Sequence, residues 1–181
     1  MKLSPILSVA ALCAGIQLAG AQSFISNLDG AQDGGGLRTG TGSVALSLSG
    51  STLTFSVGSY SGLSGTVSAS HIHGPSGPFP STGGILYNLV PTFVTTGATS
   101  GTIAAGNLNL VDNANGSGYT IAQQLAQLNS GQWYINIHTT TFGGGEIRGL
   151  ISVVPEPASA ALFVLGGVCA GWYVKRKNPR H

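Results

Sequence analysis

The stretch that decides the fold is Trp133–Leu150, WYINIHTTTFGGGEIRGL. Successive residues of a β-strand point to opposite faces of a sheet. The first half of the stretch therefore has an apolar and a polar face, made by Trp133, Ile135 and Ile137 and by Tyr134, Asn136 and His138. A glycine run at 143–145 and a second alternating run follow. This order predicts a β-hairpin with one buried face.

The register of this hairpin determines which polar side chains meet. If Ile137 pairs with Ile147, Asn136 lies opposite Arg148 and His138 lies opposite Glu146. We therefore expect a polar ladder of Asn136, Glu146 and Arg148 on the face away from the core. Cross-strand pairs of this kind contribute roughly 0.2–1 kcal/mol each, so they specify the register more than they stabilise the sheet.

A second polar motif, HIHGP at 71–75, places His71 and His73 on one face of a strand. Together with the distant His138 they form the ligand set that zinc or copper prefers. The alternative is a structural role, in which each imidazole bonds to a carboxylate or carbonyl and Glu146 serves His138. We favour the structural role at this stage, because the groups that would orient metal-ligating histidines cannot be recognised in a sequence.

The rest of the central region also alternates in short runs. Strands are predicted at 24–28, 66–73, 84–90 and 102–108, with a hairpin over 43–57 that turns at Gly50-Ser51. A helix is predicted at Ile121–Asn129, because Thr120 and Gln123 have the spacing of a capping box. The expected fold is all-β, an antiparallel β-sandwich with one short helix.

Asp29, Asp33 and the glycine run 34–36 suggest a calcium loop or a plain turn. The segment lacks the spacing and the terminal glutamate of an EF-hand, which favours the turn.

The composition excludes several functional classes. Only 7% of the 181 residues are charged, compared with roughly 25% in soluble domains. Within 22–154, two arginines stand against four acidic residues, a net charge of 2 − 4 = −2, which argues against a nucleic-acid partner. Both cysteines, Cys13 and Cys169, lie in terminal apolar segments, so the region between them forms no disulfide.

Residues 1–21 have the organisation of a secretory signal peptide. Lys2 precedes an apolar run, and Ala19-Gly20-Ala21 predicts cleavage between Ala21 and Gln22. The alternative is an uncleaved N-terminal anchor, for which the apolar run is short.

Residues 155–181 change in character. Pro155, Glu156 and Pro157 precede an apolar run at 158–174 and a basic tail of Lys175, Arg176 and Lys177. The run predicts a C-terminal transmembrane helix with its basic end in the cytoplasm. A simple C-terminal anchor is the alternative to a processed one.

Three motifs carry a resemblance to a known family. The segments Ser70–Pro75, Gly131–Thr139 and Gly144–Gly149 together resemble the CHRD domain, which occurs in chordin and in many exported bacterial proteins. The resemblance extends from about Ser23 to about Val154 and implies a β-rich extracellular domain at 22–154. It implies no established chemistry.

The C-terminal segment resembles the PEP-CTERM sorting signal of Gram-negative bacteria, on the strength of its Pro-Glu-Pro triplet, apolar run and basic tail. The resemblance implies export by the secretion machinery, an intermediate anchored in the inner membrane, and recognition by an exosortase. Removal of the tail would deliver the protein to the cell surface or an exopolysaccharide matrix.

Three functions are compatible with these observations. The first is a non-enzymatic exported domain that contacts matrix polysaccharide or surface proteins, or accepts glycans. The second is a metal-binding or redox domain that uses His71, His73 and His138. The third, a protein-binding module like the repeats of chordin, rests on analogy alone. Catalysis is the least favoured, because Glu146 has no nucleophile or second carboxylate nearby in the sequence.

Overall fold

The predicted hairpin lies in the middle of the sheet. A computed structural model describes residues 21–34, 36–78 and 80–155. In it β9 (Tyr134–Thr139) pairs antiparallel with β10 (Ile147–Val153). Ile137 lies opposite Ile147, and Asn136 lies opposite Arg148, which is the register expected from the sequence.

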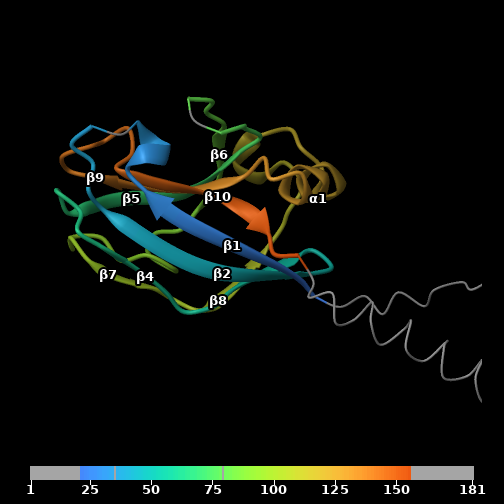
Figure 1. Ribbon diagram of the computed structural model, residues 1–181. Helices are drawn as coiled ribbons and strands as arrows, with labels where there is room; N and C mark the ends of the chain where they lie inside the picture. Colours follow the sequence, from blue (N-terminus) through green and yellow to red (C-terminus); the bar gives the residue numbers. More distant parts are fainter. Residues whose placement is uncertain (1–20, 35, 79, 156–181) are drawn as a thin grey trace, which may run out of the picture.

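In the described part of the chain, ten antiparallel strands form one hydrogen-bonded sheet (Figure 1). Its main path runs β6-β5-β9-β10-β1-β2-β3-β8, and β4 and β7 extend from β2. The remaining strands are β1 (Gln22–Asp29), β2 (Thr41–Ser49), β3 (Thr52–Phe55), β4 (Gly58–Ser61), β5 (Val67–Gly74), β6 (Gly84–Asn88), β7 (Gly101–Ile103) and β8 (Gly106–Asn109).

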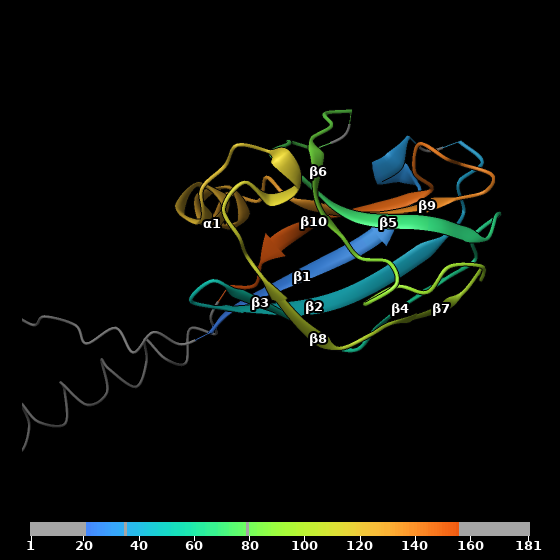
Figure 2. The ribbon, with the colours of Figure 1, turned by 180° about the vertical axis from the view of Figure 1, so that it is seen from behind.

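The all-β, antiparallel class was predicted, but a sandwich of two separate sheets was not the right description. The sheet instead curls, with β5, β9 and β10 above and β8, β4 and β7 below, and β1 and β2 join the two layers (Figures 1 and 2). The curl continues at β2, which pairs with β3 over Leu46–Ser49 and with β4 over Thr41–Ser43. Different parts of β2 thus pair with two shorter strands, β3 and β4. The alternation of apolar and polar residues does not predict this arrangement.

The core fills the inside of the curl. Residues 89–98, which connect β6 to β7, close the open side of the curl. Leu89, Gly97 and Ala98 in this segment form backbone hydrogen bonds with β5. Within this segment Phe93 stacks on Phe55 with ring centroids 4.4 Å apart. Beyond the predicted strand 84–90 no element was expected before 102, yet Leu89, Phe93 and Val94 are buried and complete the core.

Among the described residues there is one α-helix, α1 (Ile121–Asn129), which has the predicted bounds and capping box. The Thr120 hydroxyl accepts from the Gln123 backbone N–H, and the Gln123 side chain accepts from the Thr120 N–H. Leu128 is buried, and Gly131 follows the helix with φ +67°, the left-handed conformation that ends a helix. The helix delivers Trp133, fully buried, to the start of β9.

Two local predictions differ from the structure. The segment 102–108 forms the two short strands β7 and β8, because the chain pairs first with β4 and then with β3. The hairpin predicted over 43–57 ends earlier, since Val57, its last predicted residue, is 73% exposed. It lies where the chain leaves β3 and crosses to β4, so the alternation stops at Phe55.

The two ends of the described chain lie side by side. β1 and β10 are antiparallel neighbours with Phe24 opposite Val153, and the Val154 N–H donates to the Ser23 carbonyl. Over the described residues, the structure contains no helix with the length and apolar character needed to cross a membrane. The predicted signal peptide, apart from Ala21, and the segment from Glu156 onward lie outside the described residues.

Gly149 permits the close approach of β10 to β1. A Cβ atom there would lie 2.3 Å from the Asn27 carbonyl oxygen, which is backbone and cannot move aside freely. We predict that Gly149→Ala lowers the free energy of unfolding by about 1–3 kcal/mol through overpacking. Gly144→Ala is the matched control, because nothing lies within 4 Å of its added Cβ, and it should stay within about 0.5 kcal/mol of the parent in urea unfolding. Equal effects of the two variants would contradict this account.

Candidate metal centre

Three histidines meet on the face of the sheet that points away from the core. His71 and His73 come from β5, and His138 comes from the neighbouring strand β9. In the register of these strands, His71 lies opposite Asn136, His73 opposite Tyr134, and His138 opposite Ala69. His138 and His71 are therefore diagonal neighbours, which brings long side chains within reach of each other.

The three rings form a triangle. Ring centroids are 4.8 Å apart for His71 and His138, 5.4 Å for His71 and His73, and 5.8 Å for His73 and His138. Each residue offers one nitrogen, and these three atoms lie within 4.8 Å of one another. Among the described residues, this is the one group of three or more histidine, cysteine or acidic side chains close enough to hold a metal ion.

Backbone carbonyls fix the orientation of two rings. The His138 Nδ1 lies 3.0 Å from the Gly143 carbonyl oxygen, and the His73 Nδ1 lies 3.0 Å from the Gly83 carbonyl oxygen. A carbonyl only accepts, so each Nδ1 must carry the proton. The Nε2 atom of each neutral ring therefore presents a lone pair, which is the arrangement found in metal-ligating histidines.

The third ring faces one of these lone pairs. The His71 Nδ1 lies 3.1 Å from the His138 Nε2. Because the His138 Nε2 must accept, the two nitrogens share one proton. Two imidazole nitrogens bound to one tetrahedral zinc ion, each at 2.0–2.1 Å, are about 3.3 Å apart. If both nitrogens bound an ion, the shared proton would move to the His71 Nε2, so both imidazoles would stay neutral ligands with little movement of the rings.

The remaining lone pair, on the His73 Nε2, is buried and has no hydrogen-bond partner among the described residues. The His73 residue as a whole is only 8% exposed. Leaving a buried polar atom unpaired costs about 1–3 kcal/mol, so such an atom calls for an explanation.

His71 and His73 are held in the neutral form that a metal requires. Burial, followed by the nearby His138 and His73, lowers the pKa of His71 to about 4. Burial also lowers the pKa of His73, and this effect outweighs the bond to Gly83, which acts to raise it. At neutral pH both rings are therefore uncharged.

The Tyr134 ring and the Arg148 guanidinium stack next to the His73 ring. The Tyr134 ring lies parallel to the His73 ring, with centroids 4.9 Å apart and an interplanar angle of 4°. On Tyr134, in turn, lies the guanidinium of Arg148, 4.3 Å from the ring centroid. Arg148 is only 2% exposed, so its positive charge is buried close to the histidines.

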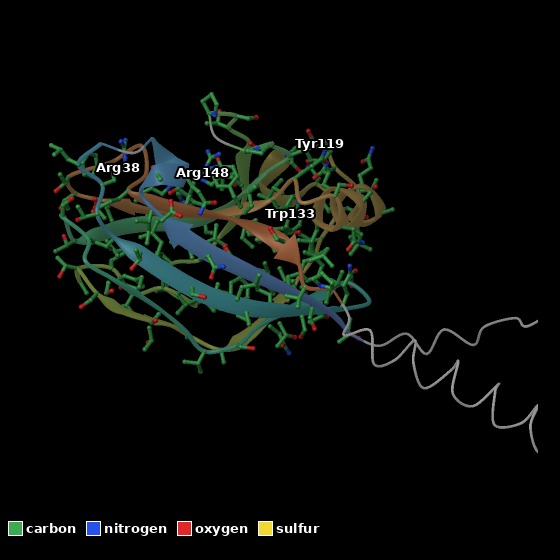
Figure 3. All side chains as sticks on the ribbon, viewed as in Figure 1. Arg38, Tyr119, Trp133 and Arg148 are labelled. Atoms are coloured by element: carbon green, nitrogen blue, oxygen red, sulfur yellow. The ribbon has the colours of Figure 1, made fainter. Side chains whose placement is uncertain are left out.

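A segment from the start of the chain covers this charged layer. The short 3-10 helix η1 (Ala31–Asp33) packs against β10, the strand that carries Arg148, and Arg38 lies in the loop between η1 and β2 (Figure 3). The Asp33 carboxylate accepts from the Asn136 side chain at 3.4 Å and lies 3.8 Å from the Arg38 guanidinium. Burial raises the pKa of Asp33, against the lowering effect of Arg38 and Arg148.

The segment is a turn, as the sequence favoured. Asp29 accepts two hydrogen bonds from Gln32, and Asp33 faces the polar layer. That this turn lies against the histidine face could not be predicted, because the contact joins residues more than 100 positions apart.

The predicted partnership of Glu146 with His138 was wrong. The Glu146 carboxylate accepts from the Ser64 N–H at 2.6 Å, from the Ser64 hydroxyl, and from the Thr139 hydroxyl at 2.6 Å. The Glu146 N–H donates to the Ile137 carbonyl, although Ile137 is also the register partner of Ile147. Two residues of one strand thus face one residue of the other, as in a β-bulge, which turns the Glu146 side chain away from His138.

The polar ladder accordingly consists of Asn136 and Arg148 without Glu146. Of the other predicted sites, Ala21 and Gln22 lie at the start of β1, and Pro155 lies at the end of the described chain. Glu156, Pro157, Lys175, Arg176 and Lys177 lie outside the described residues.

Fold and site together define a β-rich domain with a three-histidine face and no disulfide in its described part. Residues 24–151, more than two thirds of the chain, match the model of the CHRD domain. The protein therefore belongs to the CHRD domain family, as the sequence motifs suggested. No curated protein and no solved structure matches the chain.

The buried Glu146 carboxylate makes the free energy of unfolding depend on pH. Burial acts to raise its pKa, but hydrogen bonds from Thr139 and Ser64 outweigh burial and hold the pKa of Glu146 below its ordinary value of 4.5. A lowered pKa in the folded state stabilises the protein above about pH 4.5, and this stabilisation is lost as the pH falls through the folded value. We predict that Glu146→Gln loses stability at pH 7 and shows a weaker decline between pH 5 and pH 3 than the parent in urea unfolding. An equally steep acid decline in the variant would contradict this role.

Proposed function

We propose that this CHRD domain protein is exported to the cell surface and that His71, His73 and His138 bind one transition-metal ion there, copper or zinc. The observation that carries the metal proposal is the buried His73 Nε2. It has no hydrogen-bond partner among the described residues, and His73 belongs to a cluster in which one nitrogen from each of three imidazoles lies within 4.8 Å of the others.

The structural alternative explains part of the site. It accounts for the bonds from His73 and His138 to backbone carbonyls and for the contact between His71 and His138. It does not account for the unpaired His73 Nε2. The Glu146 carboxylate expected beside His138 bonds to Ser64 and Thr139 instead, and the Gly143 carbonyl takes its place. A bound cation supplies the missing partner and uses the anchored Nδ1 atoms as they stand.

The donor set favours copper or zinc over calcium or magnesium. Imidazole nitrogens suit zinc and copper, whereas calcium and magnesium take oxygen ligands. Three histidines also leave a coordination position open to water or another ligand. When bound, such an ion supplies Lewis acidity, and copper also supplies one-electron chemistry. The chain's own residues hold His71 and His73 neutral, and backbone carbonyls orient His73 and His138. We propose a binding function and not an enzymatic one.

Export is supported by where the strands begin and end. β1 begins at Gln22, the first residue after the predicted signal cleavage, and β10 ends at Val153, just before Pro155. Removal of both terminal segments would therefore leave every strand intact. We propose processing by a signal peptidase and an exosortase, through an intermediate anchored in the inner membrane, and final placement in a Gram-negative cell surface or exopolysaccharide matrix.

The arrangement of the ends also suits display. Ser23 lies beside Val154, whereas Asp29, at the other end of β1, lies opposite Arg148 below the histidine face. Six residues of strand separate these points, about 20 Å. A chain attached at one or both ends would thus hold the histidines away from its point of attachment.

The metal proposal is tested by titration. We predict that the metal-free protein binds one equivalent of Cu²⁺ or Zn²⁺ in calorimetry, and that saturation raises its unfolding temperature, because a ligand specific to the folded state stabilises it. His73→Ala and His138→Ala should each weaken binding at least about a hundredfold, more than loss of an outer-shell group does.

His181→Ala is the control, because this histidine belongs to the C-terminal segment and not to the cluster. It should bind the metal as the parent does. Retained one-to-one binding in His73→Ala, or no thermal shift with either metal in the parent, would reject the metal site.

Processing is tested by intact mass spectrometry of the protein from a host that has an exosortase. The expected product begins at Gln22 and ends near Pro155. Replacing Pro155, Glu156 and Pro157 by alanine should leave the N-terminal cut and retain the C-terminal segment. An intact product from Met1 to His181 in the parent would overturn the proposed export route.

A further inference from the structure

A second concave site lies on the other side of the loop that holds His73. Its volume is about 430 Å³, within the range of small-molecule sites. Its lining comes from the β5–β6 loop, from β6, and from the region of η2 (Ala114–Gly116), a 3-10 turn that precedes α1. The groups that matter are Thr82, Gly83, Ile85, Asn115, Ser117 and Tyr119.

The lining combines one aromatic ring with neutral polar groups. The Tyr119 side chain packs partly on the core and also lines the pocket, and it marks this region in Figure 3. Asn115 contributes an amide, and Thr82 and Ser117 contribute hydroxyls that both donate and accept. No charged side chain belongs to the lining formed by the described residues.

This chemistry narrows the class of ligand. A phosphate, carboxylate or ammonium group would enter the pocket without an opposite charge, and desolvating an unpaired ion is costly. A purely apolar ligand would leave the amide and hydroxyls without partners. A sugar ring has an apolar C–H face, which stacks on the negative face of an aromatic ring, and an edge of neutral hydroxyls. We infer that this pocket is a binding site for a neutral carbohydrate, of the size of a mono- or disaccharide unit.

The rim of the pocket is already fixed in place. Asn113 and Asn115 have φ values of 55° and 48°, in the left-handed region that non-glycine residues seldom adopt. The Asn115 side-chain nitrogen donates to the Ile85 carbonyl at 3.0 Å, and the Gly118 N–H donates to the Asn113 side chain at 2.7 Å. A strained loop held by two side-chain bonds reduces the entropy lost on binding.

The inference rests on the proposed function only for the source of the ligand, a polysaccharide outside the cell. The chemistry of the pocket stands without the histidines, none of which belongs to its lining. Sugar binding is measured on purified protein and does not depend on sorting in the cell. Loss of sugar binding can therefore be told apart from loss of metal binding or of processing, which are measured separately.

The test is a titration of the full chain with neutral disaccharides, followed by NMR or calorimetry. The chain is purified in a polyoxyethylene detergent, because sugar detergents would compete. The probes are cellobiose, maltose and the N-acetylglucosamine disaccharide, with glucose 6-phosphate and glucuronic acid as charged comparisons. We expect saturable binding of at least one neutral probe and none of the charged ones.

Three variants locate the site. Tyr119→Ala should weaken binding about tenfold or more, whereas Tyr119→Phe, which keeps the ring, should stay within about twofold. Asn115→Gly keeps the left-handed conformation and removes the amide, so about a fivefold loss is expected for one neutral hydrogen bond. Asn109→Ala, on β8 and outside the lining, is the control and should bind as the parent does.

Absence of binding by every neutral probe at about 10 mM overturns the inference, since that limit corresponds to less than 3 kcal/mol of binding free energy. Equal binding by the parent and Tyr119→Ala also overturns it, because the sugar would then lie elsewhere. Preference for a charged probe rejects the assigned ligand class. A metal titration of the same samples reports separately on the histidines.

Discussion

The register of β9 between β5 and β10 is the constraint on which both the core and the site depend. A slip of one residue would exchange the two faces of a strand. In the observed register Ile135 and Ile137 enter the core, and the same setting puts Tyr134, Asn136 and His138 on the opposite face. The burial of apolar side chains therefore positions the histidines. No separate interaction is needed to align His138 with β5.

Much of this follows from local patterns. The hairpin register, the two faces of β9 and the bounds of α1 could be predicted, because each is determined by residues close together in the sequence. The shared face of His71 and His73 followed from the period of two in the same way. The curl of the sheet could not be predicted, since it depends on β2 pairing with two strands along its length.

The features that sequence reasoning missed are backbone groups and irregularities. The carbonyls of Gly83 and Gly143 orient two histidines, yet every residue has a carbonyl, so no residue type marks them. The extra residue opposite Ile137 moves Glu146 off the histidine face, and simple alternation does not foresee it. The nearby Gly145 has φ +132°, a conformation open to glycine, and is the one local sign of this irregularity.

Although the protein has few charged residues, two of them are buried in the structure. Glu146 and Arg148 are fully buried, and each is surrounded by specific contacts: Ser64 and Thr139 for the carboxylate, the Tyr134 ring for the guanidinium. Burying charge without partners is strongly unfavourable, so these contacts are conditions for the fold and not additions to it. Arg148 also adds to the effects that keep His73 neutral.

Gly83 connects the two proposed sites. Its carbonyl accepts from His73, its N–H donates to the Tyr134 hydroxyl, and its backbone lines the pocket. A Cβ atom at this position would lie 2.7 Å from the Gly74 Cα, so a side chain would force the two ends of the β5–β6 loop apart. Through this residue, a ligand in the pocket could influence the histidines by favouring one position of Gly83 over another. Because hydrogen bonds on both sides already hold that residue, the structure favours two sites that share a rigid support over two sites that switch each other.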